Sequence, residues 1–202
     1  TMCNEPHICR MTPEVVATIA DIAEKVGILE GIRVLKPDPA LRRTNRIRTI
    51  HASLAIEGNT LSREQVTTIL DNKHVVGPRQ EIDEVRNAIR VYQIIGDLDP
   101  LSVQDFLRAH GRLMKGLISS TGSFRRGPIG VLRPGDIFKE APKWHHVEPM
   151  MQALFTYLQT TRDHYLIQSC RFHYQLEFIH PFMDGNGRMG RLWQTVLLMQ
   201  YH

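Results

Sequence analysis

Helix-start signals recur along most of this chain, and they restrict its fold more than any other feature. Ser62 is followed three residues later by Gln65, the spacing of a capping box, and an apolar stretch of helical period comes next. Thr12 and Ser102 stand in the same position before two further stretches. By residue number, the expected helices cover 13–27 or 13–31, 44–57, 63–70, 81–95, 103–117, 147–160, 164–179 and 188–201.

One long segment interrupts the helical pattern. Residues 119–142 are rich in Gly and Pro and carry several residues that favour strands, among them Ile129, Val131 and Ile137. We expect a loop there, followed by a short hairpin that turns near Arg133–Gly135. A Pro-rich stretch at residues 35–40 is expected to connect the first two helices. The pattern predicts an all-α domain with one small β-hairpin.

Length and hydropathy exclude several classes of protein. A chain of 202 residues suits one compact domain with a small appendage. No apolar run approaches the roughly 18 residues of a membrane span, and the N-terminal stretch lacks the apolar core of a signal peptide. We therefore expect a soluble, cytoplasmic protein that does not bind membranes.

The charge pattern favours a small anionic ligand. The formal net charge is +4, and the excess of basic residues lies in the second half of the chain. The pairs Arg42-Arg43 and Arg125-Arg126 are interpreted as solvated charges, and Cys170 as a small core residue. A DNA-binding regulator would rest only on the sequence pI of about 9.1, so no nucleic-acid partner is expected.

The segment from His180 to Arg191 concentrates groups that bind phosphate. Gly185-Asn186-Gly187 directly precedes an expected helix, so free backbone N–H groups there make an anion site. Arg188 and Arg191 are three residues apart and share one face of that helix. Two guanidinium groups beside such a site suit a polyphosphate better than a single phosphate.

Two further groups in the same segment suit catalysis. Asp184 supplies the single carboxylate that Mg²⁺ commonly takes beside phosphates. His180 has the side chain best suited to act as a general base near neutral pH. Each element alone is commonplace, because His-Pro often ends a helix and Gly-Asn-Gly is a frequent turn. Their joint spacing favours a functional site.

These residues resemble a known family. His180-Pro-Phe-Met-Asp184-Gly-Asn-Gly-Arg188-Met-Gly-Arg191 is similar to the Fic signature HPFx[D/E]GNGRxxR at every defined position. Upstream, Ser53-Leu-Ala-Ile-Glu57-Gly58 resembles the family's inhibitory helix pattern, [S/T]xxxE[G/N]. The resemblance covers roughly residues 45–200. It implies an all-α, Fic-type helical domain with a small β-hairpin flap.

The resemblance also implies a domain organisation. Residues 1–44 would form an N-terminal helical extension, and residues 45–202 the Fic core. Within the core, the inhibitory helix would cover about 45–58, the flap about 128–142 and the active-site loop 180–191. Because family members often continue into a further C-terminal domain, one beyond residue 202 is left open.

By this resemblance the protein would transfer AMP from ATP to a Ser, Thr or Tyr hydroxyl of a target protein. The resemblance implies that His180 is the general base and that Asp184 binds Mg²⁺. Gly185, Asn186 and Gly187 would cradle the phosphates. Arg188 would contact the β-phosphate, and Arg191 would contact the γ-phosphate. Gly187 stands where the phosphate-transferring branch of the family carries Lys, which favours AMP transfer.

Ser53, Glu57 and Gly58 would form a brake, in which Glu57 pairs with Arg191 and displaces the γ-phosphate. A capping or surface glutamate is the alternative for Glu57. The target protein, which could be another copy of this chain, would dock on the flap. A hydrolase that removes AMP, a nucleotide-sensing module without catalysis, and a homo-oligomer remain open.

Overall fold

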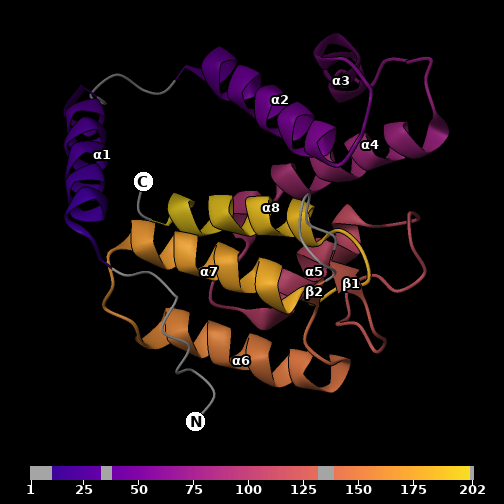
Figure 1. The fold of residues 1–202 in the computed structure, drawn as a ribbon. Helices are drawn as coiled ribbons and strands as arrows, with labels where there is room; N and C mark the ends of the chain where they lie inside the picture. Colours follow the sequence, from indigo (N-terminus) through magenta and orange to yellow (C-terminus); the bar gives the residue numbers. More distant parts are fainter. Residues whose placement is uncertain (1–10, 33–37, 132–138, 201–202) are drawn as a thin grey trace. The chain divides into compact units, whose positions relative to one another are not determined.

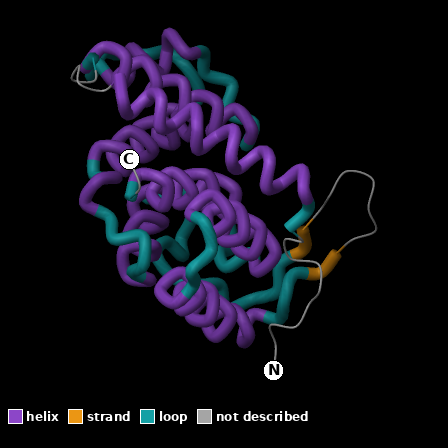
Figure 2. The backbone as a smooth tube through the Cα atoms, turned by 90° about the vertical axis from the view of Figure 1, so that its left-hand side faces the viewer, coloured by secondary structure: helices purple, strands orange, loops and turns teal. Residues whose placement is uncertain are grey.

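The computed structural model describes residues 11–32, 38–131 and 139–200 (Figure 1). The chain divides into two compact units, residues 1–45 and 46–202. Helices dominate the described residues, so the expected all-α class is confirmed (Figure 2). Among the described helices, none combines the length and apolar composition that a membrane span requires.

The first unit contains α1 (Pro13–Ile32), which begins where the sequence predicts. The backbone N–H of Val15 donates to Thr12 Oγ1 at 3.4 Å, and Pro13 occupies the first helical position. The helix continues past Gly27, the earlier of its two expected ends. Several large apolar side chains of α1 are exposed, including those of Val16 and Leu29.

The second helix, α2 (Pro39–Ile56), begins earlier than expected. The stretch at 35–40 was predicted to be a connection, yet Asp38 Oδ1 accepts a hydrogen bond from Ala40 N–H at 2.9 Å. Asp38 thus caps the helix, and Pro39 stands at its first position, where the lack of an N–H costs nothing. The boundary between the two units falls within this helix.

The remaining helices follow the predicted order; α3 has the predicted bounds, and the others differ from the prediction at one or both ends. They are α3 (Arg63–Leu70), α4 (Arg79–Gln93), the 3₁₀ helix η1 (Ile95–Asp97), α5 (Val103–Leu113), α6 (Trp144–Thr160), α7 (Tyr165–Ile179) and α8 (Asn186–Met199). The capping box before α3 is confirmed, because Gln65 N–H donates to Ser62 Oγ at 3.3 Å and Ser62 N–H donates to Gln65 Oε1 at 2.8 Å.

The expected hairpin is present only as a minimal strand pair. Strand β1 (Gly130–Val131) pairs antiparallel with β2 (Lys139–Glu140), with Gly130 opposite Glu140. The predicted turn near residue 134 lies outside the described residues. The described chain is therefore a helical domain with one two-residue strand pair, and it does not establish a hairpin flap.

An aromatic cluster joins the helices of the second unit. The Phe106 ring on α5 lies within 5.0–6.3 Å of the rings of Phe155, Phe172, Phe182 and Trp193. These rings come from α6, α7, the loop after α7, and α8. Helix α8 packs on α7 and α7 on α6 (Figure 1). The segment between α7 and α8 is thus anchored through Phe182 in the core. Cys170, predicted to be a core residue, is exposed.

Candidate active site

The candidate site is built on the loop between α7 and α8. His180 follows the last residue of α7 in a left-handed conformation, with φ 51° and ψ 62°. Its N–H donates to Leu176 O at 2.8 Å and closes the helix end. The predicted stop before Pro181 is confirmed, and α8 begins at Asn186, two residues earlier than expected. The six residues between the helices therefore form a tight turn.

The His180 ring is oriented by its own helix. Its Nδ1 lies 3.3 Å from the carbonyl oxygen of Glu177. A carbonyl oxygen only accepts hydrogen bonds, so Nδ1 must carry the proton in this contact. The lone pair of the neutral ring is then on Nε2. His180 can accept a proton at that atom.

Asn186 closes the loop. Its side chain is buried, Oδ1 accepts from Phe182 N–H, and Nδ2 donates to Phe182 O, both at 2.9 Å. These two hydrogen bonds to the backbone N–H and carbonyl groups of one residue fix the loop against the start of α8. The expected phosphate contact of the Asn186 amide must therefore rely on its second hydrogen or on the backbone.

Gly185 allows this closure. Its φ of 82° belongs to the left-handed region that favours glycine. A Cβ at this position would also stand 2.7 Å from Met114 Sδ. The loop thus depends on glycine here for both conformation and space.

The first turn of α8 presents unpaired backbone donors. The first hydrogen bond of the helix runs from Met189 N–H to Gly185 O at 2.9 Å. The N–H groups of Asn186, Gly187 and Arg188 precede it, so helix geometry leaves them without an acceptor in the helix. Together with the helix dipole they form an anion-binding end.

Arg191 connects this end of α8 with α2, as the resemblance to the family implies. Its Nη2 lies 2.6 Å from Glu57 Oε1, and its Nε donates to Ser53 Oγ at 2.9 Å. Nη2 also donates to the Ser53 carbonyl oxygen at 3.0 Å. Gly58, with φ 92°, follows directly and turns the chain at the end of α2. Two of the three residues of the expected brake, Ser53 and Glu57, therefore contact Arg191, and Gly58 follows Glu57 in the chain.

The Glu57 carboxylate lies against the first turn of α8. A Cβ built at Gly187 would stand 2.6 Å from Glu57 Oε1 and 3.1 Å from Arg191 Nη1. The carboxylate thus fills the space that the missing side chain of Gly187 leaves open. An anion bound to the amides of this turn would compete with Glu57 for the same position.

Arg188 is held by two carboxylates. Its side chain is only 7% exposed, Nη2 lies 3.0 Å from Asp184 Oδ1, and Nη1 lies 3.3 Å from Glu84 Oε1. Glu84 belongs to α4 and also accepts a hydrogen bond from Asn59 Nδ2 at 3.0 Å. Sequence reasoning missed Glu84, because no local pattern relates it to a loop 104 positions away.

Among Glu57, Glu84 and Asp184, the carboxylate of Asp184 is the most exposed to solvent. Its side chain is 52% exposed, so it keeps oxygen lone pairs available beside Arg188. No group of three or more His, Cys, Asp or Glu side chains suited to a metal lies among the described residues. Mg²⁺ bound to a nucleotide does not need one, since phosphates and water complete its shell.

A second missed residue, His110 of α5, lies behind the loop. It is fully buried, and its ring stacks on Phe182 with a centroid distance of 3.6 Å. Nδ1 accepts from Gly122 N–H at 2.9 Å, so the proton is on Nε2, which donates to Asp184 O at 3.1 Å. Burial lowers the pKa of His110 to about 4, so the ring is neutral near pH 7.

Arg125 also contradicts its sequence interpretation. It was expected to be solvated, yet it is 3% exposed and donates to the His180 carbonyl oxygen from Nε at 2.8 Å. Burial lowers the pKa of its guanidinium. Its neighbour Arg126 is exposed, as expected. The neighbours Arg125 and Arg126 therefore differ, since the first is buried and the second is exposed.

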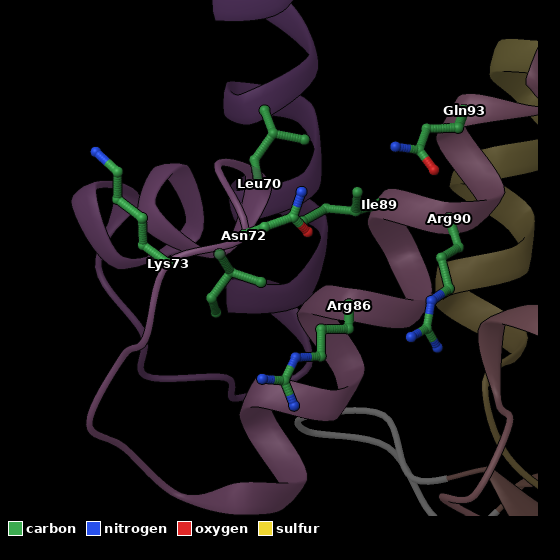
Figure 3. Close-up of a pocket in the computed structure, with 8 residues that line it drawn as sticks. Leu70, Asn72, Lys73, Arg86, Ile89, Arg90 and Gln93 are labelled. Atoms are coloured by element: carbon green, nitrogen blue, oxygen red, sulfur yellow. The ribbon is translucent and has the colours of Figure 1, made fainter.

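A separate pocket of about 260 Å³ lies between α3 and α4 (Figure 3). Its lining includes Leu70 and Ile89 with the basic side chains of Lys73, Arg86 and Arg90. None of the predicted site residues lines it. The pocket is therefore distinct from the α7–α8 loop.

Comparison with known families fits this geometry. Residues 100–198 match the model of the Fic/DOC family, and the match includes the whole α7–α8 loop. This chain carries a Fic/DOC family domain. The Fic domain model begins after α4, so the Fic match itself covers neither Glu57 nor Glu84.

Curated relatives of this Fic chain include proteins named protein adenylyltransferase Fic. The one from Aedes aegypti is 30% identical over 179 residues, which is 80% of this chain and 34% of the relative. The one from Culex quinquefasciatus is 29% identical over 199 residues, covering 88% of this chain and 37% of the relative. The chain thus spans about a third of the length of these relatives.

Solved structures support the same Fic fold. A Fic family protein from Desulfovibrio desulfuricans G20 superposes with a TM-score of 0.92 and 47% identity, over 96% of this chain and 60% of that chain. Fic-1 from C. elegans gives a TM-score of 0.70 at 24% identity over 93% of this chain and 60% of that one, a likeness in fold alone.

Proposed function

We propose that this chain is an autoinhibited protein adenylyltransferase that transfers AMP from ATP to a Ser, Thr or Tyr hydroxyl of a target protein. The observation that carries the proposal is the Glu57–Arg191 pair at the first turn of α8. This turn has the donors that a polyphosphate needs, and a carboxylate occupies one of its arginines. The relatives named protein adenylyltransferase support the choice of reaction.

The reaction would be a displacement at the α-phosphorus of ATP. The hydroxyl oxygen of the target forms a bond to this phosphorus while the bond to the bridging oxygen of the leaving pyrophosphate breaks. His180 would take the hydroxyl proton at Nε2, the ring atom left free by the Glu177 contact. Positioning and charge stabilisation supply most of the rate enhancement in such transfers.

The phosphates would lie along the start of α8. The amides of Gly185, Asn186 and Gly187 would cradle them, Arg188 would stabilise charge on the departing pyrophosphate, and Arg191 would hold the γ-phosphate. Asp184 would hold Mg²⁺, which supplies charge neutralisation between the α- and β-phosphates when bound. The exposure of the Asp184 carboxylate fits this role.

The brake would act through competition for Arg191. While Glu57 holds the Arg191 guanidinium, the γ-phosphate loses its partner and ATP binds in an unproductive position. The target is proposed to dock beside the β1–β2 pair, within the expected flap at 128–142, as a strand added to an open edge. We place the reaction in the cytoplasm, where ATP is available.

The test uses ATP labelled on the α-phosphate, with Mg²⁺ and a bacterial lysate. It compares the wild type, Glu57→Gly and the double variant Glu57→Gly/His180→Ala. The expected result is strong labelling of protein by Glu57→Gly, weak labelling by the wild type and none by the double variant. If no variant labels protein although each binds ATP, adenylyl transfer is wrong. Release of AMP from modified protein would then indicate a hydrolase, and its absence a nucleotide sensor.

A further inference from the structure

We propose that Arg125 is a positioning residue that holds the catalytic histidine and both ends of the β1–β2 segment in one arrangement. The inference rests on the proposed function, in which His180 is the base and the target docks beside this strand pair. Arg125 would act through His180 and through the docking edge, and would touch neither ATP nor the hydroxyl.

The Arg125 side chain is a buried hub of hydrogen bonds. It is 3% exposed, and its partners are carbonyl oxygens. Nε donates to His180 O at 2.8 Å, and Nη2 donates to Ile179 O at 3.3 Å. Nη1 donates to Gly127 O at 2.9 Å, and Nη2 also donates to Pro142 O. The planar fork of a guanidinium can serve several acceptors at fixed angles, which a lysine ammonium cannot.

These acceptors belong to three segments of the chain. Ile179 and His180 end α7, Gly127 precedes β1, and Pro142 follows β2. The Arg125 backbone adds a further contact, because its N–H donates to the carbonyl oxygen of Pro181 at 2.8 Å. Arg125 thus links His180, the proposed base, to the residues that flank the strand pair on either side.

His180 depends on such support. Its left-handed backbone is unfavourable for a residue with a side chain, so surrounding contacts must hold it. The Arg125 bond to the His180 carbonyl oxygen is one of them. Losing it would free the peptide to relax and would shift the imidazole relative to the α-phosphorus. A displacement of about 1 Å at a reacting group lowers a rate by about 100-fold.

The described hydrogen bonds of the Arg125 side chain do not go to the phosphate-binding groups. Arg188 is held by Asp184 and Glu84, and Arg191 contacts Ser53 and Glu57. Removal of the Arg125 side chain is therefore expected to spare ATP binding while it impairs transfer. A general loss of structure would weaken both.

The kinetic experiment uses the full chain carrying Glu57→Gly. Arg125→Ala and Arg125→Lys are compared with Arg126→Ala, which removes the same charge from the exposed neighbour. We expect kcat to fall about 100-fold in Arg125→Ala, with Kd for Mg·ATP within about twofold of the parent. Arg125→Lys should recover little of the lost kcat, and added methylguanidinium should restore part of the rate of Arg125→Ala. Arg126→Ala should match the parent. Equal losses of kcat and ATP affinity, or an unchanged kcat, would overturn the proposal.

A second readout does not depend on catalysis. In protein labelled with ¹⁵N-histidine, the His180 ring resonances should shift in Arg125→Ala, and those of His164, at the far end of α7, should not. Unchanged His180 resonances would refute the positioning role whatever the activity. If the parent transfers no AMP but the His180 resonances shift, the proposed function fails and the positioning role stands.

Discussion

Glu57 Oε1 and Arg191 Nη2 lie 2.6 Å apart, although 134 positions separate the two residues in the sequence. Both side chains keep about a quarter of their surface exposed. Water therefore screens the pair, and its contribution is about 1 kcal/mol rather than that of a buried ion pair. A contact of this strength can hold Arg191 in the resting protein and still yield to a modest signal.

Replacing Glu57 by Gln tests this competition through binding alone. The amide keeps the shape of the side chain but removes its charge, so Arg191 becomes available to phosphate. Since 1 kcal/mol corresponds to about a fivefold change in Kd, ATP should bind about fivefold more tightly. ADP, which lacks the γ-phosphate assigned to Arg191, should change less than twofold. Isothermal titration calorimetry measures both, with the exposed Glu148→Gln as control. Equal gains for ATP and ADP would contradict the assignment.

Glu84→Ala should destabilise the fold far more than loss of its neighbour Asp83. Arg188 is 7% exposed, and removing Glu84 leaves this buried guanidinium with Asp184 as its remaining acidic partner. Breaking a buried ion pair costs about 3 kcal/mol in the free energy of unfolding. Asp83 pairs with Arg86 at the surface, so Asp83→Ala should cost less than about 1 kcal/mol. Urea unfolding of the two variants checks the difference, and similar costs would show that Glu84 is not a structural partner of Arg188.

His110 makes stability depend on acid pH. Burial lowers its pKa to about 4 from the ordinary value of 6.5, so between these values the unfolded chain binds more protons than the folded one. Stability attributable to His110 is complete above pH 6.5 and is lost as the pH falls towards 4. Between pH 7.5 and pH 5 the loss should be about 2 kcal/mol. Urea unfolding of the wild type and of His110→Gln at pH 7.5 and pH 5 tests this. Between these pH values the variant should lose about 2 kcal/mol less of its free energy of unfolding than the wild type. Parallel pH profiles would refute the prediction.

Asn186→Ala should loosen the loop between α7 and α8. The backbone N–H and carbonyl groups of Phe182 would each lose the hydrogen bond to the Asn186 side chain. A buried polar group left without a partner costs about 1–3 kcal/mol, so we expect a loss of about 2 kcal/mol in stability together with weaker ATP binding. Asn45→Ala, at an exposed helix position, serves as the control and should change neither quantity. Stable Asn186→Ala with unchanged ATP affinity would show that the loop does not need this closure.

The parts of the site that the sequence predicts are local in the chain. The anion-binding turn and the pair Arg188 and Arg191 lie within twelve residues, where helix geometry alone determines which groups share a face. The contact between Glu57 and Arg191 is long-range, and it was predicted only because the residues resemble a known pattern. Spacing alone would have left Glu57 as a surface residue.

The residues that support the site escaped prediction for one physical reason. His110, Arg125 and Glu84 reach the loop or its end across 74, 55 and 104 positions. Their partners are mostly backbone carbonyl groups or side chains of other helices, which leave no periodic signal. Burial decided their roles, and burial depends on the tertiary packing.

The start of α2 was predicted wrongly for a different reason. The connection expected at 35–40 contains Asp38-Pro39, which is a good helix start, although a Pro-rich stretch is equally typical of a connection. A proline has opposite effects at the first position and in the interior of a helix. The start of α2 was therefore accessible to sequence reasoning and was missed.

The space at Gly187 also constrains how this protein can evolve. Any residue with a side chain at that position would meet the Glu57 carboxylate within 2.6 Å, so its effect depends on a residue 130 positions earlier. Because this carboxylate is the end of a flexible side chain, a substitution at 187 would push Glu57 away from its position beside Arg191. Changes at position 187 and changes in the Glu57–Arg191 contact are therefore coupled, and neither position is expected to evolve independently of the other.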